Sequence, residues 1–281
     1  MKQVIYYSKS MNDKGESISR KRFAEKALDI YKDLIGEKVL VKPNHVSFEE
    51  YPATTHSQML EVVIEWLQKN GYQFIVGDGK AIDVFKYKMR NTPLKQVCQK
   101  YSIEFTDFYK EKMVEYQTPR GWSVTMADIG FKVDTIISLP VLKAHPQGRL
   151  RMTGALKNVV GFFSRQERFM LHPGSIVKDP FKTIAEANWI LTKSPKAPKQ
   201  IIIEDAIYTL IKANERRHGG QFSFLGYLLA GICPVVLDIY GFSLLKQVEP
   251  AFKDKDYDYI KYLPYAIEYG VGGTDYEIKE I

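Results

Sequence analysis

Residues Lys38–Gly79 read KVLVKPNHVSFEEYPATTHSQMLEVVIEWLQKNGYQFIVGDG and contain the pattern from which the class of the fold follows. The apolar run Lys38–Val41 is typical of a buried strand and stops at a proline. A helical face follows at three- and four-residue spacing, formed by Leu60, Val63, Ile64 and Leu67. Tyr72–Val76 is a second apolar run that ends at a glycine. Strand, helix and strand within about 40 residues predict a βαβ unit with parallel strands and a right-handed crossover.

The helix of this unit carries signals at both ends, and similar signals mark elements farther along the chain. Thr55 and Gln58 have the spacing of a capping box, and Asn70-Gly71 is a typical helix stop. Further helices are expected at Ser17–Ile35, Pro93–Lys100, Thr153–Phe163, Pro180–Leu191, Pro234–Lys246 and Asp256–Tyr269. Strands are expected at Gln3–Tyr7, Asp134–Leu139 and Gln200–Ile203, with short alternating pieces at Glu104–Phe108, Met113–Gln117 and Trp122–Met126.

These elements predict an α/β fold: a mainly parallel central sheet with helices on both faces and a small antiparallel excursion in the middle. With 45% apolar and 26% charged residues and no repeat or polar linker, residues 1–281 are expected to form a single α/β domain. No apolar run approaches the roughly 20 residues that cross a bilayer, and the start MKQVIYYSKSMNDKGES turns polar too early for a secretory signal. We therefore expect a cytoplasmic protein with no membrane partner.

The two cysteines argue against a metal cluster held by thiolates. Cys98 and Cys233 are far apart and belong to no CxxC or Cys/His group, so neither an iron–sulfur cluster nor a structural zinc site of usual spacing can be built from them. We expect buried or half-buried thiols, and the sequence leaves their redox state open.

The positive charge is concentrated in one stretch. The chain carries 40 Lys and Arg against 33 Asp and Glu, a net charge of +7. Most of this excess lies between Lys143 and His172, where six cationic residues meet one acid: Lys143, Arg149, Arg151, Lys157, Arg165, Arg168 and Glu167. The stretch is either a solvated basic loop or a site for something anionic.

Polar clusters follow the ends of four predicted strands. They are Lys42-Pro43-Asn44, Gly77-Asp78-Gly79, Lys143-Ala144-His145 and Glu204-Asp205. In open α/β sheets, ligands bind outside the carboxyl ends of the parallel strands. The sequence therefore predicts one shared rim that binds a small anionic metabolite, a carboxylate or a phosphate.

Ten residues are candidates for this site. We expect Lys143, His145 and Asp78 to be catalytic, and Lys42, Asn44, Thr55, His56, Thr153, Lys157 and Asn158 to bind substrate. Two of the lysines, Lys143 and Lys157, would neutralise the anion. His145 and Asp78 would form a proton-transfer pair, since an imidazole with a pKa of about 6.5 holds both protonation states near neutrality. Structural roles stay open for several of them: a solvated strand end, a turn, or a surface position on a helix.

Two other interpretations remain open. Imidazole and carboxylate groups of His56, Asp78, His145 and His172 could hold zinc, iron or nickel, although their spacing is not diagnostic. The basic stretch could instead belong to a non-catalytic binding module or bind nucleic acid, and nucleic acid is less expected because the aromatic residues are not interleaved with the stretch. Walker A, GxGxxG, GxSxG and HExxH motifs are all missing, so no nucleotide or other cofactor is assigned from motifs.

Several motifs together resemble the DUF362 family. They are VLVKPN (Val39–Asn44), ATTH (Ala53–His56), GDG (Gly77–Gly79), DTIISLPVLKAH (Asp134–His145), TGALKNVVGF (Thr153–Phe162), His172, and LAG followed by Asp238 and Gly241. The similarity covers about Lys38 to Lys246. The start of the chain is also loosely similar to the amino-terminal half of nickel-pincer lactate racemases.

Members of the DUF362 family often carry an appended ferredoxin-like domain and are named iron–sulfur proteins for it. This sequence lacks the corresponding cysteines. The resemblance therefore implies cluster-based electron transfer only if a separate iron–sulfur redox partner supplies the cluster.

Overall fold

The computed structural model describes residues 2–10, 19–84, 89, 91–171 and 178–281. Its α-helices are α1 (Arg20–Ile30), α2 (Ser57–Lys69), α3 (Pro93–Lys100), α4 (Arg165–Met170), α5 (Pro180–Lys193), α6 (Pro234–Leu245) and α7 (Tyr262–Glu268). Its strands are β1 (Gln3–Lys9), β2 (Lys38–Pro43), β3 (Gln73–Asp78), β4 (Phe105–Asp107), β5 (Met113–Gln117), β6 (Ser123–Ala127), β7 (Thr135–Leu139), β8 (Val141–His145), β9 (Arg151–Thr153), β10 (Lys199–Ile211), β11 (Gln221–Gly231) and β12 (Tyr276–Glu280). Short 3₁₀ helices lie at Lys32–Leu34, Ile82–Val84, Phe108–Lys110, Asp128–Phe131, Leu156–Phe162, Arg216–His218, Pro250–Phe252 and Tyr257–Tyr259.

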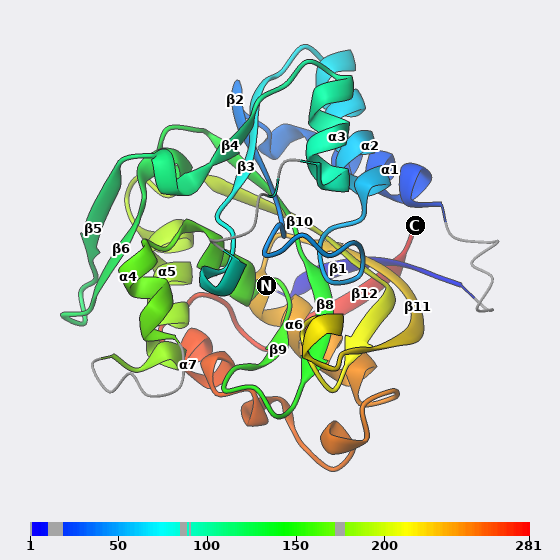
Figure 1. The fold of residues 1–281 in the computed structure, drawn as a ribbon, viewed down its shortest axis with the longest axis vertical. Coiled ribbons are helices and arrows are strands. Elements are labelled where there is room, and N and C mark those ends of the chain that lie inside the picture. The colour runs from blue at the N-terminus through cyan, green and yellow to red at the C-terminus, as the bar shows by residue number, and fades with distance from the viewer. Residues whose placement is uncertain (1, 11–18, 85–88, 90, 172–177) are drawn as a thin grey trace.

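A ten-stranded mixed sheet runs through the molecule in the order β12-β1-β11-β10-β7-β2-β3-β4 (Figure 1). The five strands from β10 to β4 are mutually parallel, and β11 pairs antiparallel to both β10 and β1. β8 follows β7 after Pro140 and pairs with the second half of β10, while β9 pairs antiparallel to β8. The predicted α/β fold with a mainly parallel sheet is confirmed.

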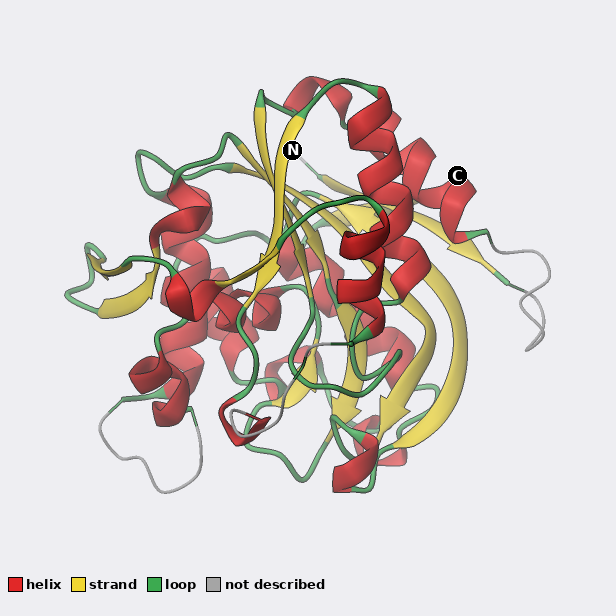
Figure 2. Cartoon of the chain, turned by 45° about the horizontal axis from the view of Figure 1, so that its top comes forward, coloured by secondary structure: helices red, strands yellow, loops and turns green. Residues whose placement is uncertain are grey.

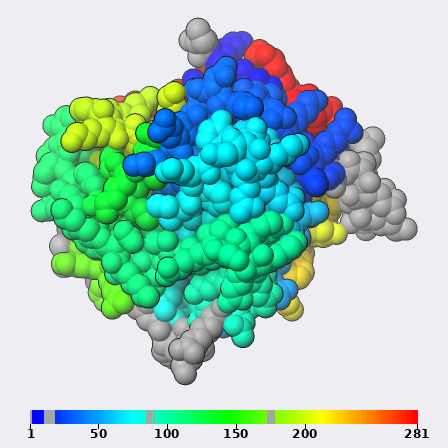
Figure 3. All heavy atoms as spheres, turned by 90° about the horizontal axis from the view of Figure 1, so that it is seen from above, coloured from blue at the N-terminus to red at the C-terminus, as the bar shows by residue number. Residues whose placement is uncertain are grey.

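Helices cover both faces of this sheet (Figure 2), because alternate residues of each strand are apolar on opposite sides. Val39 and Val41 of β2 pack into the core under α1, α2 and α3, whereas Leu40 packs into the core shared with α5, α6 and α7. Seen from above, residues of the α1–α3 layer, in blue to green-cyan, cover the middle and right of the surface, and green residues of later segments cover its left side (Figure 3). The same alternation places Lys42 on the face of Leu40.

The predicted βαβ unit is present as β2, α2 and β3. The chain runs from β2 outward to β3 and β4, then returns to the other side of β2 as β7. The strand order thus reverses at the β2–β7 pair, and a crevice outside the carboxyl ends of strands is expected at such a switch point.

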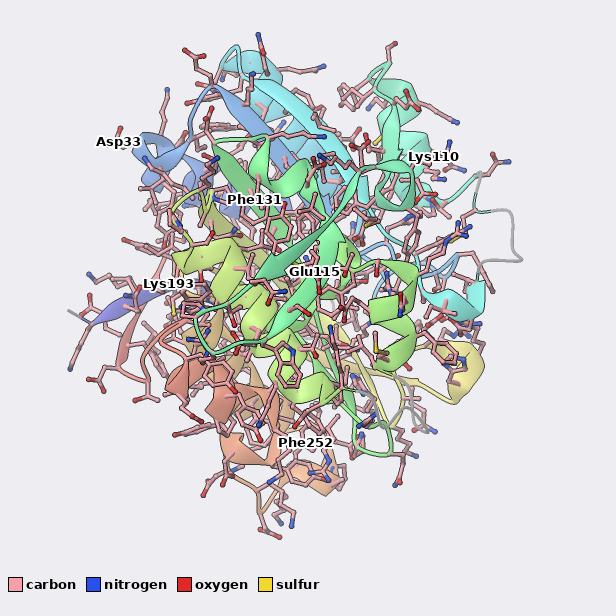
Figure 4. All side chains as sticks on the ribbon, turned by 90° about the vertical axis from the view of Figure 1, so that its left-hand side faces the viewer. Asp33, Lys110, Glu115, Phe131, Lys193 and Phe252 are labelled. Carbon is pink, nitrogen blue, oxygen red and sulfur yellow. The ribbon has the colours of Figure 1, made fainter. Side chains whose placement is uncertain are left out.

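The antiparallel excursion forms a separate two-stranded sheet of β5 and β6, which faces the viewer in Figure 4 with Glu115 labelled. Tyr116 of β5 stacks on Phe131, with ring centroids 4.5 Å apart. β4, expected as part of the excursion, instead joins the main sheet parallel to β3.

Four expected elements differ from the observed ones. The predicted helix Thr153–Phe163 is β9 followed by the 3₁₀ helix Leu156–Phe162, and the predicted helix Asp256–Tyr269 is a 3₁₀ turn followed by α7. The predicted helix Ser17–Ile35 is α1 and a short 3₁₀ helix, with Ser17 and Ile18 outside the described residues. The strand expected at Gln200–Ile203 continues to Ile211, since β7 and β8 pair with its two halves in turn. None of the described helices is long and apolar enough to cross a membrane.

Candidate functional site

A cavity of about 290 Å³ lies beyond the carboxyl ends of β2 and β3, beside β8 and β9. Eight of the ten predicted site residues line it: Lys42, Asn44, Asp78, Lys143, His145, Thr153, Lys157 and Asn158. Val46, Ala81, Gln147, Gly148, Arg149, Leu150, Val160, Gly161, Arg168, Leu171, Asn214 and Glu215 complete the lining. Residues from four separate parts of the chain therefore meet at one edge of the sheet.

One wall is an ion pair at the ends of β2 and β3. Lys42 Nζ lies 2.8 Å from Asp78 Oδ1 and 3.1 Å from Asn158 Oδ1, and both charged side chains are buried. The other Asp78 oxygen accepts a hydrogen bond from the His45 amide at 2.7 Å. Burial lowers the pKa of Lys42, and the charge of Asp78 opposes this shift. With these partners, the pair is satisfied within the protein and fixes the two strand ends to each other.

Two glycines make room for this pair. A Cβ atom on Gly161 would collide with Asp78 Oδ1 and come within 2.7 Å of Lys42 Nζ. A Cβ atom on Gly79 would collide with the carbonyl oxygen of Gly161. The segment that follows β9 can therefore approach the β3 exit only because both positions lack side chains.

Lys143 enters the cavity from β8 without a carboxylate partner. It is 1% exposed, and Nζ donates a hydrogen bond to the carbonyl oxygen of Ala53 at 2.7 Å. Among the residues that the structure describes, no carboxylate oxygen lies within 4 Å of this ammonium group. Burial lowers the pKa of Lys143 to about 8, opposed by the charges of Glu215 and Glu49.

Thr153 links a lysine and a histidine across the cavity. Its Oγ1 accepts a hydrogen bond from Lys157 Nζ at 2.9 Å and lies 3.0 Å from His145 Nε2. Burial, together with the charges of Lys143 and Arg168, lowers the pKa of Lys157 to about 7. Burial and the charges of Lys157 and Lys143 lower the pKa of His145 well below its ordinary value. The imidazole is therefore neutral at physiological pH, and the Thr153 hydroxyl is placed to donate to it.

The expectation that His145 holds both protonation states near neutrality is wrong for this reason. His145 and Asp78 line the same cavity but have different partners: Thr153 for the imidazole, and Lys42, His45 and Gly79 for the carboxylate. No hydrogen bond or ion pair joins the two side chains in the described structure. Their arrangement does not form the direct proton-transfer pair that the sequence suggested.

Asn44 presents an unpartnered acceptor. Its amide donates a hydrogen bond to Thr55 Oγ1 at 2.8 Å, and its carbonyl oxygen accepts one from the Thr55 amide at 3.0 Å. Its side chain is 3% exposed, yet Oδ1 has no hydrogen-bond partner among the described residues. A buried amide oxygen without a donor costs free energy, so we expect a molecule in the cavity to donate a hydrogen bond to this atom.

Thr55 and His56 are not among the residues that line the cavity. Thr55 Oγ1 donates to the carbonyl oxygen of Leu139 at 2.6 Å, so its hydroxyl joins the ends of β2 and β7. The N-cap of α2 is His56, whose Nδ1 accepts from the amide of Gln58. The predicted Thr55–Gln58 capping box is therefore wrong, because the Thr55 hydroxyl is already engaged by the strands.

His56 instead lies in a polar cluster at the other side of this loop. Its ring packs edge-on against Tyr51, with centroids 5.0 Å apart, and the Tyr51 hydroxyl donates to Asp205 at 2.6 Å. Burial and the charge of Arg20 lower the pKa of His56 to about 4. Arg20 also pairs with Asp205 at 2.5 Å, so Asp205 is paired here and does not line the cavity.

Arg168 and Glu215 are cavity residues to which sequence reasoning gave no role in the site. Arg168 is buried, and it donates to the carbonyl oxygen of Gly79 at 2.6 Å and to the Tyr109 hydroxyl at 3.1 Å. Glu215 is paired with Arg217, with Nε 2.8 Å from Oε2. The clustering of charge between Lys143 and His172 could have identified Arg168, whereas Glu215 follows a long strand and gives no local signal.

Two buried carboxyl groups, Asp238 and Glu204, lie behind the cavity, and Asp238 supports the segment after β9. Asp238 of α6 accepts hydrogen bonds from the amides of Ala155 and Leu156, at 2.6 and 3.2 Å. Glu204 is fully buried, and neither of its carboxyl oxygens has a hydrogen-bond partner among the described residues. Burial, and for Glu204 the nearby charges of Asp238 and Asp205, raises both pKa values, that of Asp238 to about 7. Glu204 was expected at the rim but lies beneath it.

The described residues contain no group of three or more His, Cys, Asp or Glu side chains placed to hold a metal ion. Of the four proposed metal ligands, His145 and Asp78 reach the cavity, His56 does not, and His172 lies outside the described residues. Cys98 and Cys233 are buried free thiols, as expected.

Comparison with known proteins gives a family and several matching solved structures, among them the two given below. A family model described as "Domain of unknown function (DUF362)" matches residues 39–243. The lactate racemase apoprotein from Thermoanaerobacterium thermosaccharolyticum has a TM-score of 0.51 at 10% identity, over 88% of this chain and 57% of that one. A protein from Thermotoga maritima has a TM-score of 0.44 at 13% identity, over 89% and 59%.

This chain thus spans less than two thirds of the length of either solved protein. At 10% identity, the likeness to the racemase apoprotein concerns the fold alone. No curated protein matches the sequence.

Proposed function

This chain belongs to the DUF362 family, whose domains have no assigned function, and we propose from its site residues that the cavity binds a small anionic metabolite, a carboxylate or a phosphate. The cavity, at about 290 Å³, is at the small end of the range for ligand pockets, so the ligand is a small metabolite rather than a dinucleotide.

The balance of charge in the cavity carries this proposal. Five cationic side chains line it against two carboxylates: Lys42, Lys143, Arg149, Lys157 and Arg168 against Asp78 and Glu215. Both carboxylates already have partners, Asp78 in Lys42 and Glu215 in Arg217. Lys143 and Lys157 have only neutral oxygen atoms as described partners. Two buried or half-buried ammonium groups are costly without a counter-charge, and a bound anion would supply it.

The hydrogen-bonding groups suggest how such a ligand is oriented. Lys143 and Arg168 are donors for its acidic group, Lys157 lies beside them, and Asn44 Oδ1 is an acceptor with no hydrogen-bond donor among the described residues. A hydroxyl or amine on the ligand would satisfy Asn44. In this arrangement Lys157, with its pKa near 7, is the group best suited to exchange a proton, and Thr153 connects it to His145.

Ligand-induced thermal stabilisation tests the proposal. The probes are acetate, glycolate, malate, inorganic phosphate and glycerol phosphate, each compared with chloride at the same ionic strength. Binding at a hundredfold excess over Kd stabilises the folded state by about 2.7 kcal/mol. We expect at least one probe to raise the melting temperature in a saturable way, and Lys143→Met and His145→Gln to abolish this response singly.

Lys253→Gln is the matched control, because Lys253 is exposed and lies outside the cavity. This variant should respond like the wild type. If none of the five anions stabilises the wild type, or if both cavity variants respond as strongly as it does, the proposed site is wrong.

A further inference from the structure

We propose that Lys157 is a nucleophile that forms an imine with the aldehyde or ketone carbonyl of an anionic ligand. The inference deepens the proposed function and rests on it: the ligand is a small anion that also carries a carbonyl group, such as a 2-oxo acid or an aldehyde phosphate.

The Lys157 amine can reach a ligand in the cavity. Lys157 lines the cavity and is partly exposed, so its Nζ is accessible to a molecule inside it. Its described hydrogen-bond partner is a neutral hydroxyl, Thr153 Oγ1 at 2.9 Å, and no described carboxylate lies within 4 Å. A lysine held by an ion pair stays protonated and cannot attack a carbonyl, whereas this one has no such partner.

The surrounding charges favour the neutral amine. Lys143 and Arg168 both lower the pKa of Lys157, in addition to burial, and Glu215 is the opposing carboxylate. With a pKa of about 7, roughly half of the Lys157 side chains are neutral at pH 7, against about one in 2,500 for an ordinary lysine. A lysine activated by desolvation and neighbouring cations is a recognised way to obtain an amine nucleophile.

The same cations orient the ligand. Lys143 on β8 and Arg168 on α4 can hold the carboxylate or phosphate, since Lys157 need not be charged for this. The carbonyl next to that acidic group then faces Lys157. Lys143 and Arg168 thus bind the anionic group, and Lys157 attacks the carbonyl carbon.

The bond changes balance without an oxidant or reductant. The nitrogen lone pair of neutral Lys157 forms a bond to the carbonyl carbon, and the C=O electron pair moves to oxygen, which takes up one of the two nitrogen protons. The carbinolamine then loses its hydroxyl with the second proton as water, and a C=N bond remains. Thr153, between Lys157 Nζ and His145 Nε2, is placed to pass these protons.

Borohydride trapping tests the imine. The protein is incubated at pH 7 with glyoxylate, pyruvate or glycolaldehyde phosphate, reduced with borohydride, and examined by intact mass and peptide mapping. We expect one reduced adduct per chain, located at Lys157, formed at least about tenfold faster than adducts on exposed lysines such as Lys253. The trapping rate should be half-maximal near pH 7, where Lys157 loses its proton.

Lys157→Arg keeps a cation but cannot form an imine, so it should lose the adduct. Because mapping of the wild-type protein already assigns the site, the test does not depend on this variant folding. If an oxo-anion stabilises the protein thermally but no adduct forms at Lys157, or forms no faster there than at Lys253, the imine is refuted and anion binding stands. If none of the three carbonyl anions stabilises the protein or is trapped, this inference fails, and the separate non-carbonyl probes decide whether anion binding fails too.

Discussion

At the scale of single residues, the cavity combines charge with burial in a way that makes its lysines sensitive to pH. Lys143 is buried against a carbonyl oxygen, and the half-buried Lys157 donates to a hydroxyl. Neither partner compensates a full positive charge, so each ammonium group destabilises the ligand-free protein and favours an anion. Binding and stability are therefore expected to respond to pH in opposite directions.

For Lys143, whose pKa is lowered to about 8, anion affinity should fall as the pH rises through this value, because the neutral amine attracts the ligand less. The loss should be about tenfold or more between pH 7 and pH 9. The contribution of Lys143 to the free energy of unfolding changes with pH in the opposite direction to the anion affinity. The unfolded chain binds the extra proton up to the ordinary lysine pKa, so the free energy of unfolding rises from about pH 8 towards that value.

Lys143→Met separates these effects. The variant should be more stable than the wild type at pH 7, by about 1–3 kcal/mol, and the difference should shrink towards pH 10. Calorimetric titration with the best anion, alongside denaturant unfolding at each pH, measures both. A wild-type affinity that is constant from pH 6 to pH 9 would contradict the role given to the lysines.

Glu204 makes a second residue-scale prediction. Burial and the nearby Asp238 and Asp205 raise its pKa well above the ordinary value. The folded state therefore holds a proton that the unfolded state has released, and stability falls as the pH rises above the ordinary range of a carboxyl group. Glu204→Gln remains neutral at every pH. It should be about as stable as the wild type at pH 5 and more stable at pH 8, by about 1–3 kcal/mol.

Denaturant unfolding at the two pH values measures this difference. Glu104→Gln, at an exposed position, is the control and should change little at either pH. If Glu204→Gln is no more stable than the wild type at pH 8, then burial and the nearby Asp238 and Asp205 do not raise the pKa of Glu204.

At the scale of elements, the site depends on the close approach of the 3₁₀ helix Leu156–Phe162 to the end of β3. Asp238 of α6 holds the start of this segment, and the Lys42–Asp78 pair lies against Gly161 near its end. The segment carries Lys157 and Asn158, so its position sets theirs. The sequence pattern TGALKN could not show this, because its helical spacing gives no indication of a preceding strand.

Gly161→Ala should therefore disturb the site through packing alone. The added methyl group would collide with Asp78 and press on Lys42, neither of which can move without breaking a buried ion pair. We expect a loss of about 1–3 kcal/mol in stability and a loss of the anion response. Gly273→Ala is the matched control, because a Cβ atom there meets nothing within 4 Å. Thermal melts with and without the best anion compare the two, and equal behaviour would show that Gly161 does not limit the approach.

At the scale of the whole molecule, the parallel strands explain why residues far apart in sequence form one cavity. The order of strands reverses at the β2–β7 pair, and the ends of β2 and β3, together with β8, supply Lys42, Asn44, Asp78, Lys143 and His145. The alternating apolar runs and the βαβ unit were enough to predict this convergence, because parallel strands must end at the same edge.

What the sequence could not supply were contacts that depend on exact geometry. Thr55 looked like a helix cap because only its neighbours in sequence were visible, whereas its hydroxyl joins two strands. Glu204 looked like a strand end, whereas β10 continues beyond it because β8 extends the sheet. Protonation states depend on burial and on neighbours from other elements, so the neutral state of His145 was equally hidden.

The whole-molecule distribution of charge also bears on nucleic acid. Much of the net charge of +7 comes from the basic stretch, but Lys143 and Arg168 of that stretch are 1% and 5% exposed, inside the cavity. Side chains buried in this way cannot reach the phosphates of a polymer that is too large to enter. We therefore expect these two side chains to contribute nothing to oligonucleotide binding, so Lys143→Met should leave any binding at low salt unchanged. Fluorescence anisotropy across a salt series measures this. If Lys143 contacted the phosphate backbone, Lys143→Met would instead weaken binding and lower the slope of log affinity against log salt concentration by about 0.7. That result would place the functional site on a nucleic-acid-binding surface and not in the cavity.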